Sequence, residues 1–435
     1  MAVPSVSGSF VLGITGVSWE LLSRYATGGE LTNIERLLAS GASGPLDLLK
    51  PGTGPMAWTS MVTGARPDKH QIYGPKRVDS AYRQRSVTSH DRELPPAWEF
   101  VSPAFVANVP VTYPARALEG TLVAGPPFSD DPKLLTHPRS FAAELDATIP
   151  DYSFSTPLNR AELAEHYQSC RLIMHRFMHA SAGWSLQWIV LSIPARIREI
   201  DASDAIELLS PLDELVGELI TYVNRQHANL FIVSAPTVYS PTQGNPVEEC
   251  LVEGGYTPPT DTRKPSRLDR LVNRFLGRPS PMTDTTAFAV GDNVFVNDTT
   301  RFRGGSVAPA DVPSVKADLT RYLSRNSPHQ VYDSDRPSEP DNHKPDLVVT
   351  SPAADLLYPS RPHNEIDPRG VYVAYGPNIR EGHINNPTVL DVVPTLLHSQ
   401  LRAIPSFVDG QVLDIFSPSS TVAAQSPTVA SSQSD

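Results

Sequence analysis

The stretch FVLGITGVSWELL (residues 10–22) decides the fold class of this chain. Its first five residues, Phe10 to Ile14, form a β-prone apolar run, and Gly16 and Ser18 mark a turn. An amphipathic helix is expected to open at Trp19. A strand that leads through a short turn into a helix is the repeating unit of an α/β sheet. The stretch therefore predicts an α/β protein.

Apolar runs of the same kind recur along the chain. They lie at residues 105–109, 188–192, 230–234 and 371–375, and a second helix is expected over residues 33–38, ending at Gly41. Continuous apolar runs that alternate with helical stretches are typical of a parallel sheet covered on both faces. In such a sheet ligands bind beyond the carboxyl ends of the strands, so functional residues are expected there.

Composition narrows the class of partner. The 435 residues hold 36 Lys and Arg against 47 Asp and Glu, a net charge of −11, which argues against a binder of nucleic acid or of anionic membranes. Two Cys exclude a disulfide scaffold and a Cys-built zinc site. No window approaches the roughly 18 apolar residues of a membrane span, and the expected location is the cytoplasm.

The chain divides by composition. Residues 1–243 are expected to form the first part of the core, and residues 345–416 the second part. Between them, residues 244–344 are rich in Pro, Thr, Arg and Asp and predict an inserted cap, with one helix near 317–323 and one strand at 294–297. Residues 417–435 are rich in Ser, Thr and Ala without periodicity, which predicts a disordered tail.

The segment KPGTGPMAWTSMVTGARPDKHQI (residues 50–72) resembles the nucleophile segment of the type I phosphodiesterase/nucleotide pyrophosphatase branch of the alkaline phosphatase superfamily. The resemblance continues in order through further segments: residues 108–114, 245–256, 292–297, 345–347, 370–377, 391–397 and 409–410. It implies an alkaline phosphatase-like three-layer sandwich with a mixed, mostly parallel central sheet and an inserted cap.

The resemblance also implies where the family's chemistry should lie. Active members use two divalent ions, held by three Asp and three His, to activate a Thr nucleophile. Here the nucleophile position is Gly54, or Thr53 after a slip of one residue. The six ligand positions are occupied by Thr15, Ala195, Glu199, Ala235, Pro236 and Ile366, with His363 three residues upstream of the last. Since Ala and Pro have no side-chain donor, the two-metal centre is expected to be dismantled.

Two further groups of residues could form a binding site in place of the two-metal centre. Arg196 and Arg198 stand beside lost ligand positions, where guanidinium groups can hold a phosphate or carboxylate, unless they pair with Glu199 and Asp201. The second group consists of loop residues, which either are only solvated or converge on the old site. They are Asp341, His343, His363 and Asp367.

Three hypotheses follow. The favoured one is a pseudoenzyme that binds a small anionic ligand or a partner protein in the old cleft, with no cofactor. The alternative is an enzyme with redirected, metal-independent or one-metal chemistry that uses some of these residues: Thr15, Thr53, Glu199, His363 and Asp367. The third is an active metal-dependent phosphodiesterase, which would need zinc or another divalent metal and a different ligand alignment.

Overall fold

The computed structural model describes residues 7–50, 54–126, 134–149, 160–179, 183–193, 202–236, 246–258, 284–326, 330–334, 343–350 and 369–417. Within them lies a nine-stranded sheet of order β15-β2-β14-β9-β1-β8-β5-β6-β7. Its strands span the following residues: β1 Ser9–Thr15, β2 Ala42–Leu46, β5 Ala104–Ala107, β6 Gly120–Val123, β7 Thr136–His137, β8 Leu186–Ser192, β9 Asn229–Ala235, β14 Gly370–Tyr375 and β15 Gly382–His383.

The sheet is mixed and mostly parallel, as the sequence predicts. Strand β1 pairs in parallel with β8 and β9, and β5 pairs in parallel with β8 and β6. Strand β14 runs antiparallel to β9 and β2, and β7 runs antiparallel to β6. All five predicted apolar runs are strands, namely β1, β5, β8, β9 and β14.

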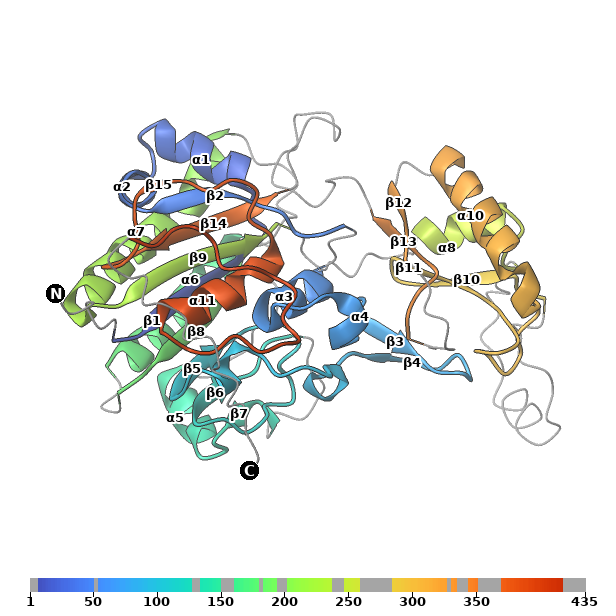
Figure 1. Ribbon diagram of the computed structural model, residues 1–435, viewed down its shortest axis with the longest axis horizontal. Coiled ribbons are helices and arrows are strands. Elements are labelled where there is room, and N and C mark those ends of the chain that lie inside the picture. Colours follow the sequence, from blue (N-terminus) through green and yellow to red (C-terminus); the bar gives the residue numbers. More distant parts are fainter. Residues whose placement is uncertain are drawn as a thin grey trace, which may run out of the picture.

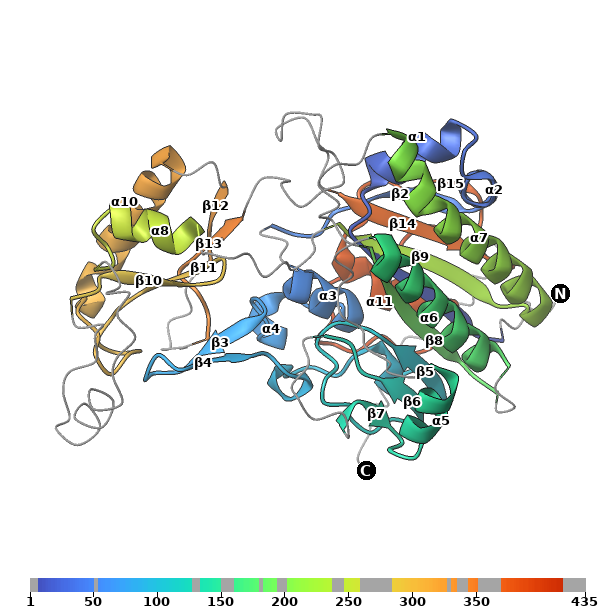
Figure 2. The same ribbon diagram turned by 180° about the vertical axis from the view of Figure 1, so that it is seen from behind.

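Helices cover both faces of this sheet. One face packs against α1 (Trp19–Thr27), α2 (Thr32–Ser40), α5 (Phe141–Thr148), α6 (Arg160–Met178) and α7 (Ala202–Gln226). The other face packs against α3 (Gly54–Thr63) and α11 (Val392–Ser399). Figure 1 shows α3 and α11 in front of the sheet, and Figure 2 shows α6 and α7 in front of its other face. The architecture is the predicted three-layer sandwich.

β1 divides its side chains between the two cores. Phe10, Leu12 and Ile14 belong to the core beneath α1, α6 and α7, whereas Val11 belongs to the core beneath α3. This alternation follows from the two-residue period of a strand. Both sets are apolar because helices cover both faces, which is why the run reads as continuously hydrophobic.

A smaller unit, called here the small lobe, holds a four-stranded sheet of order β10-β11-β13-β12. Its strands are β10 Ala287–Val290, β11 Asn293–Val296, β12 Gln330–Asp333 and β13 Leu347–Thr350, and its helices are α8 Pro246–Glu253 and α10 Val312–Asn326. The division expected from composition assigns residues 347–350 to the core. The structure instead pairs β13 with β11 and β12, so this strand belongs to the small lobe.

A hairpin from the core reaches the small lobe. It consists of β3 (Lys76–Val78) and β4 (Gln84–Ser86), and α4 (Pro67–His70) precedes it. At its tip the Tyr82 ring stacks on Phe302, 5.3 Å between centroids, and its hydroxyl donates to Asn297 Oδ1 at 2.7 Å. Figure 1 shows the hairpin running from the core toward the small lobe.

No helix among the described residues combines the length and apolar character that crossing a membrane requires. Of the predicted tail, residues 417–435, only Ser417 lies within the described residues.

Candidate functional site

The carboxyl ends of the central parallel strands bring two of the predicted positions, Thr15 and Ala235, side by side. Thr15, the last residue of β1, is in register with Ala235 at the end of β9 and with Ser192 at the end of β8. Backbone hydrogen bonds extend this register, because Gly16 N donates to Ala235 O at 3.1 Å and Ile193 N donates to Thr15 O at 3.3 Å. This is the edge at which α/β sheets bind ligands.

Helix α3 covers the same face as Thr15. Gly13 precedes Thr15 by two residues, so both face the same side of the strand. A Cβ on Gly13 would lie 2.7 Å from the Trp58 ring, which shows that α3 packs directly on this part of β1. Gly54, which stands at the expected nucleophile position, is the first residue of α3 and is buried. Glycine offers no nucleophilic atom.

These positions offer few side-chain atoms that could bind a metal ion. Thr15 is 7% exposed, and its Oγ1 is a buried atom with no hydrogen-bond partner in the described part of the chain. Ala235 and Pro236 are both buried and carry no side-chain donor for a cation. The described ranges contain no group of three His, Cys, Asp or Glu placed to bind a metal ion. Thr15, Ala235 and Pro236 therefore do not fit the carboxylate and imidazole positions of a two-metal centre.

Asn108 adds a polar group to this edge of the sheet. It follows β5 directly, is 1% exposed, and has the positive φ of 58° that Asn tolerates better than most residues. Its Nδ2 donates to Val190 O of β8 at 2.6 Å, while its Oδ1 has no hydrogen-bond partner among the described residues. In the sequence, Asn108 is marked only as the first residue of the segment 108–114, which resembles the family, and no role is predicted for it.

A buried histidine contacts the end of β8 on the face of the sheet opposite α3. His166 of α6 accepts a hydrogen bond from Ser192 N at Nε2, 2.9 Å away, and burial lowers its pKa to about 4. Cys170 Sγ lies 3.6 Å from the same nitrogen, and burial raises the pKa of this thiol. The pair is therefore a neutral imidazole beside a protonated thiol, which is unsuited to nucleophilic catalysis. The i, i+4 spacing of the two residues was the available signal in the sequence.

A second buried histidine joins α3 to α4. His70 Nε2 lies 2.9 Å from Ser60 Oγ, and His70 Nδ1 accepts from Ile72 N at 3.1 Å. Since Nδ1 is the acceptor, Nε2 carries the proton of the neutral ring and donates it to Ser60. A serine nucleophile would need the reverse arrangement, with Nε2 accepting from the hydroxyl. This contact is structural.

The remaining predicted site residues fall mostly outside the described ranges. That set comprises Thr53, Ala195, Arg196, Arg198, Glu199, Asp341, His363, Ile366 and Asp367. His343 is described, and it lies half-buried in the segment that leads into β13 of the small lobe.

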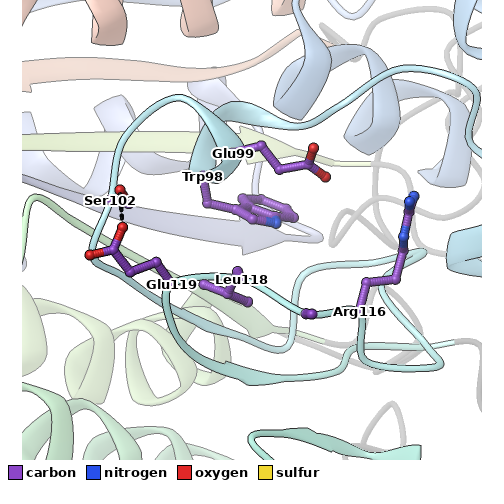
Figure 3. Close-up of a pocket in the computed structure, with 7 residues that line it drawn as sticks. Trp98, Glu99, Ser102, Arg116, Leu118 and Glu119 are labelled. Carbon is purple, nitrogen blue, oxygen red and sulfur yellow. Dashed lines mark hydrogen bonds between the residues drawn. The ribbon is translucent and has the colours of Figure 1, made fainter.

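The described residues also form a shallow pocket of about 440 Å³, but it lies elsewhere. Its lining includes Trp98, Arg116 and Glu119, drawn in Figure 3. These residues precede β5 and β6, which start side by side at Ala104 and Gly120. The pocket therefore opens at the amino ends of these parallel strands, away from the edge that carries Thr15 and Asn108.

Solved structures of similar fold share little sequence with this chain. Wild-type alkaline phosphatase PafA superposes with a TM-score of 0.60 at 14% identity, covering 95% of this chain and 99% of that one. Human ectonucleotide pyrophosphatase/phosphodiesterase 5 gives a TM-score of 0.52 at 13% identity, covering 94% and 100%. The inactive murine form of that protein, in complex with AMP, gives 0.52 at 13% identity, covering 92% and 96%. These matches confirm the alkaline phosphatase-like fold.

A search of curated protein sequences gives no significant match. The sequence model of the family described as type I phosphodiesterase / nucleotide pyrophosphatase matches residues 10–351, most of the chain, and thereby confirms the resemblance seen in residues 50–72. The chain belongs to the type I phosphodiesterase/nucleotide pyrophosphatase family.

Proposed function

We propose that this protein is a non-catalytic member of its family that binds a small anionic ligand or a partner protein at the carboxyl ends of β1, β8 and β9. The observation that carries the proposal is the pair Ala235 and Pro236, buried at the end of β9 where the family needs an Asp and a His. Neither side chain has an atom that can bind a cation, and so neither can act even as a weak ligand.

Thr15 and Gly54 support the same proposal. Thr15 takes the place of the first Asp at the end of β1, and its neutral hydroxyl supplies no charge to offset the repulsion between two dications. Gly54 opens α3 without a hydroxyl at the nucleophile position. The absence of a carboxylate at Thr15 and of a hydroxyl at Gly54 supports the proposed loss of two-metal hydrolysis.

The decisive experiment measures metal content and activity on one preparation. We expect the purified protein to contain no tightly bound zinc or manganese. We also expect no hydrolysis of an aryl phosphodiester such as bis(4-nitrophenyl) phosphate, with or without added Zn²⁺, Mn²⁺ or Mg²⁺. Two tightly held divalent ions per chain, or metal-dependent turnover, would overturn the proposal and favour the metallohydrolase.

A substitution separates the pseudoenzyme from redirected chemistry. Thr53→Ala removes the hydroxyl that could act as nucleophile after a slip of one residue. The pseudoenzyme predicts that a cellular phenotype complemented by the wild-type chain is complemented equally by the variant. Loss of complementation by a variant that melts at the wild-type temperature would point to metal-independent or one-metal catalysis instead.

We further propose that the protein acts in the cytoplasm. Cys170 is buried, Cys250 is half-buried, and both are free thiols, as expected for a reducing compartment. Cell fractionation with an antibody against the chain tests this location, and recovery in the culture medium would contradict it.

A further inference from the structure

The shallow pocket at the amino ends of β5 and β6 is built on a rigid frame. Ala104 N donates to Glu119 O at 2.8 Å, just where the two strands begin. Gly120 has a φ of 132°, and a Cβ there would lie 1.9 Å from Ala104 O, so only glycine allows this close approach of the strands. The segments that line the pocket are held in place by this pairing.

The pocket has an aromatic and aliphatic centre. Trp98 is 3% exposed and packs edge-on against Trp188 of β8, with 6.0 Å between ring centroids. On another side the Arg92 guanidinium lies 6.0 Å from the Trp98 ring centroid, a cation–π distance. Leu118 adds an aliphatic, partly buried wall. The Trp98 ring cannot turn without disturbing the core, so the pocket is preformed.

Opposite charges lie on opposite sides of this centre. In Figure 3 the Arg116 guanidinium and the Glu119 carboxylate stand on either side of Trp98 and Leu118, and a second carboxylate of the lining, Glu99, is drawn between Trp98 and Arg116. Glu119 Oε2 is fixed by a hydrogen bond from Ser102 Oγ at 2.8 Å. Arg116 is exposed and forms no ion pair with any residue that the structure describes.

Buried positive charge strengthens the Arg116 side. Arg92 is 5% exposed, and its guanidinium donates to Leu94 O at 3.1 Å and Val111 O at 3.3 Å. Burial and the charge of Arg116 lower the pKa of Arg92 to about 10, against the opposing effect of the Glu99 carboxylate, and Arg92 remains charged at neutral pH. Arg92 does not itself line the pocket, so it adds positive charge behind Trp98 without contacting a ligand, and the Glu99 carboxylate in the lining offsets part of that charge.

We propose that this pocket binds a small zwitterion, with its anionic group on Arg116, its ammonium group on Glu119, and a short aliphatic spacer over Leu118 and Trp98. The volume of about 440 Å³ is large enough for a ligand of amino-acid size. The site is separate from the carboxyl ends of the strands, and it stands whether or not that edge of the sheet is catalytic.

The test uses the full-length chain and a series of ω-amino acids. Glycine, 4-aminobutanoate and 6-aminohexanoate are titrated by calorimetry at pH 7, with hexanoate and hexylamine as probes that carry only one of the two charges. We expect one member of the zwitterion series to bind at least tenfold more tightly than both singly charged probes. Failure of every zwitterion to bind at 10 mM, or equal binding of hexylamine, overturns the proposal.

Variants locate the binding. Arg116→Gln and Glu119→Gln should each weaken the best zwitterion at least tenfold, because each removes the countercharge of one ligand group. The matched controls are Arg36→Gln and Glu35→Gln, exposed residues of α2, which should leave binding unchanged. All four variants are first shown to melt as the wild type does. Unchanged binding in both pocket variants overturns the assignment of the site.

Discussion

Thr15 and Ala235 stand side by side at the carboxyl ends of β1 and β9, in parallel register. Neighbouring residues of parallel strands in register point to the same face of the sheet. Ala235 belongs to the core beneath α3, so both side chains face the helix that opens at Gly54. The backbone needed for a pair of adjacent carboxylates is present, and the carboxylates are not.

This relationship predicts that metal binding can be introduced. The triple variant Thr15→Asp, Ala235→Asp, Pro236→His places two carboxylates and an imidazole at the edge where the family holds its ions. Without metal the variant should melt below the wild type, because it buries like charges with no partner. Zinc at about 100 times its dissociation constant should then raise the free energy of unfolding of the variant by about 2.7 kcal/mol.

Thermal melting with and without zinc, together with the zinc content of the dialysed protein, provides the measurement. The wild type serves as the control and should show no zinc-dependent rise. An equal rise for wild type and variant would mean that other residues of the chain already bind zinc, and the interpretation of Ala235 and Pro236 would fail.

Acid should destabilise the protein through His70. Burial, followed by the charge of Arg92, lowers the pKa of His70 to about 3 from its ordinary value of 6.5. The unfolded chain therefore binds a proton between pH 6.5 and 3 that the folded chain does not. The contribution of His70 to the free energy of unfolding is fully present above pH 6.5. It is lost at about 1.4 kcal/mol per pH unit as the pH falls from 6.5 to 3.

Urea unfolding at pH 7, 6 and 5 measures this slope. His70→Gln removes the titrating ring and should reduce the loss of stability between pH 7 and pH 5, relative to the wild type. His227→Gln is the control, since His227 is exposed. If His70→Gln and His227→Gln lose stability in parallel with the wild type, protonation of His70 is not the cause.

The sequence was most informative where side chains are apolar and strands are central. Residues 10–14 and 230–234 predicted β1 and β9, because both faces of these strands are buried and read as continuous hydrophobic runs. Strand β2 was missed because its sequence, Ala42-Ser43-Gly44-Pro45-Leu46, contains turn-forming residues. Pairing with β14 and β15 overrides that local preference.

The site was predictable only in part, for a different reason. A position such as Thr15 is identified by counting along a strand that the pattern reveals, and the structure places it at the end of β1 as counted. Asn108 and His166 act through contacts with β8, to Val190 O and from Ser192 N. Both contacts join residues far apart in the sequence, and no local periodicity reports them.

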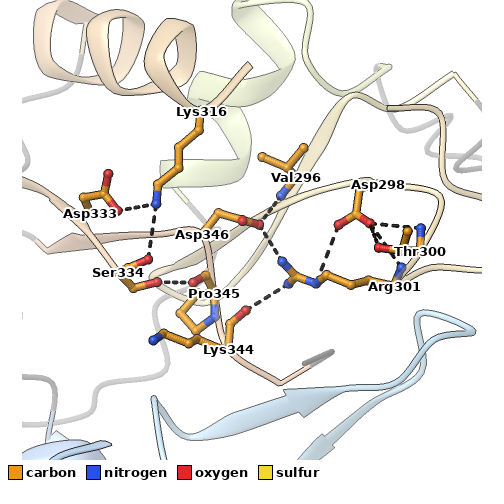
Figure 4. Close-up of polar contacts among 10 residues, drawn as sticks. All are labelled: Val296, Asp298, Thr300, Arg301, Lys316, Asp333, Ser334, Lys344, Pro345 and Asp346. Atoms are coloured by element: carbon orange, nitrogen blue, oxygen red, sulfur yellow. Dashed lines mark hydrogen bonds and ion pairs between the residues drawn. The ribbon is translucent and has the colours of Figure 1, made fainter. Parts of the chain in front are cut away.

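The small lobe depends on a buried ion pair. Arg301 Nη1 lies 3.0 Å from Asp346 Oδ2, and the two side chains are almost fully buried. Val296 N donates to the same carboxylate at 2.7 Å, and Arg301 Nη2 donates to Lys344 O at 2.9 Å, as Figure 4 shows. The network thus joins β11 to the segment before β13.

Removing one member of this pair should cost much more than removing a surface pair. Arg301→Met leaves the buried carboxyl groups of Asp346 and Asp298 without the cation they face, and we expect a loss of about 3–5 kcal/mol in the stability of the small lobe. Arg321→Met, which breaks the exposed Arg321–Asp318 pair, should cost less than about 1 kcal/mol. Hydrogen exchange of the β11 amides measures the stability of the small lobe in both variants. Equal losses of stability in Arg301→Met and Arg321→Met would show that the buried network does not stabilise the lobe.

Helix α2 lacks an N-cap side chain of its own, because Leu31 occupies that position. Asp213 of α7 supplies the acceptor instead: its Oδ1 accepts from Ile34 N at 2.8 Å and its Oδ2 from Asn33 N at 3.2 Å. Asp213→Ala leaves these buried donors unsatisfied and should destabilise the protein by about 1–2 kcal/mol in urea unfolding. The adjacent exposed residue provides the control, since Glu214→Ala removes a carboxylate from the same helix and should change stability by less than about 0.5 kcal/mol. A loss at Glu214 as large as that at Asp213 would attribute the effect to the overall charge of α7 and not to the cap.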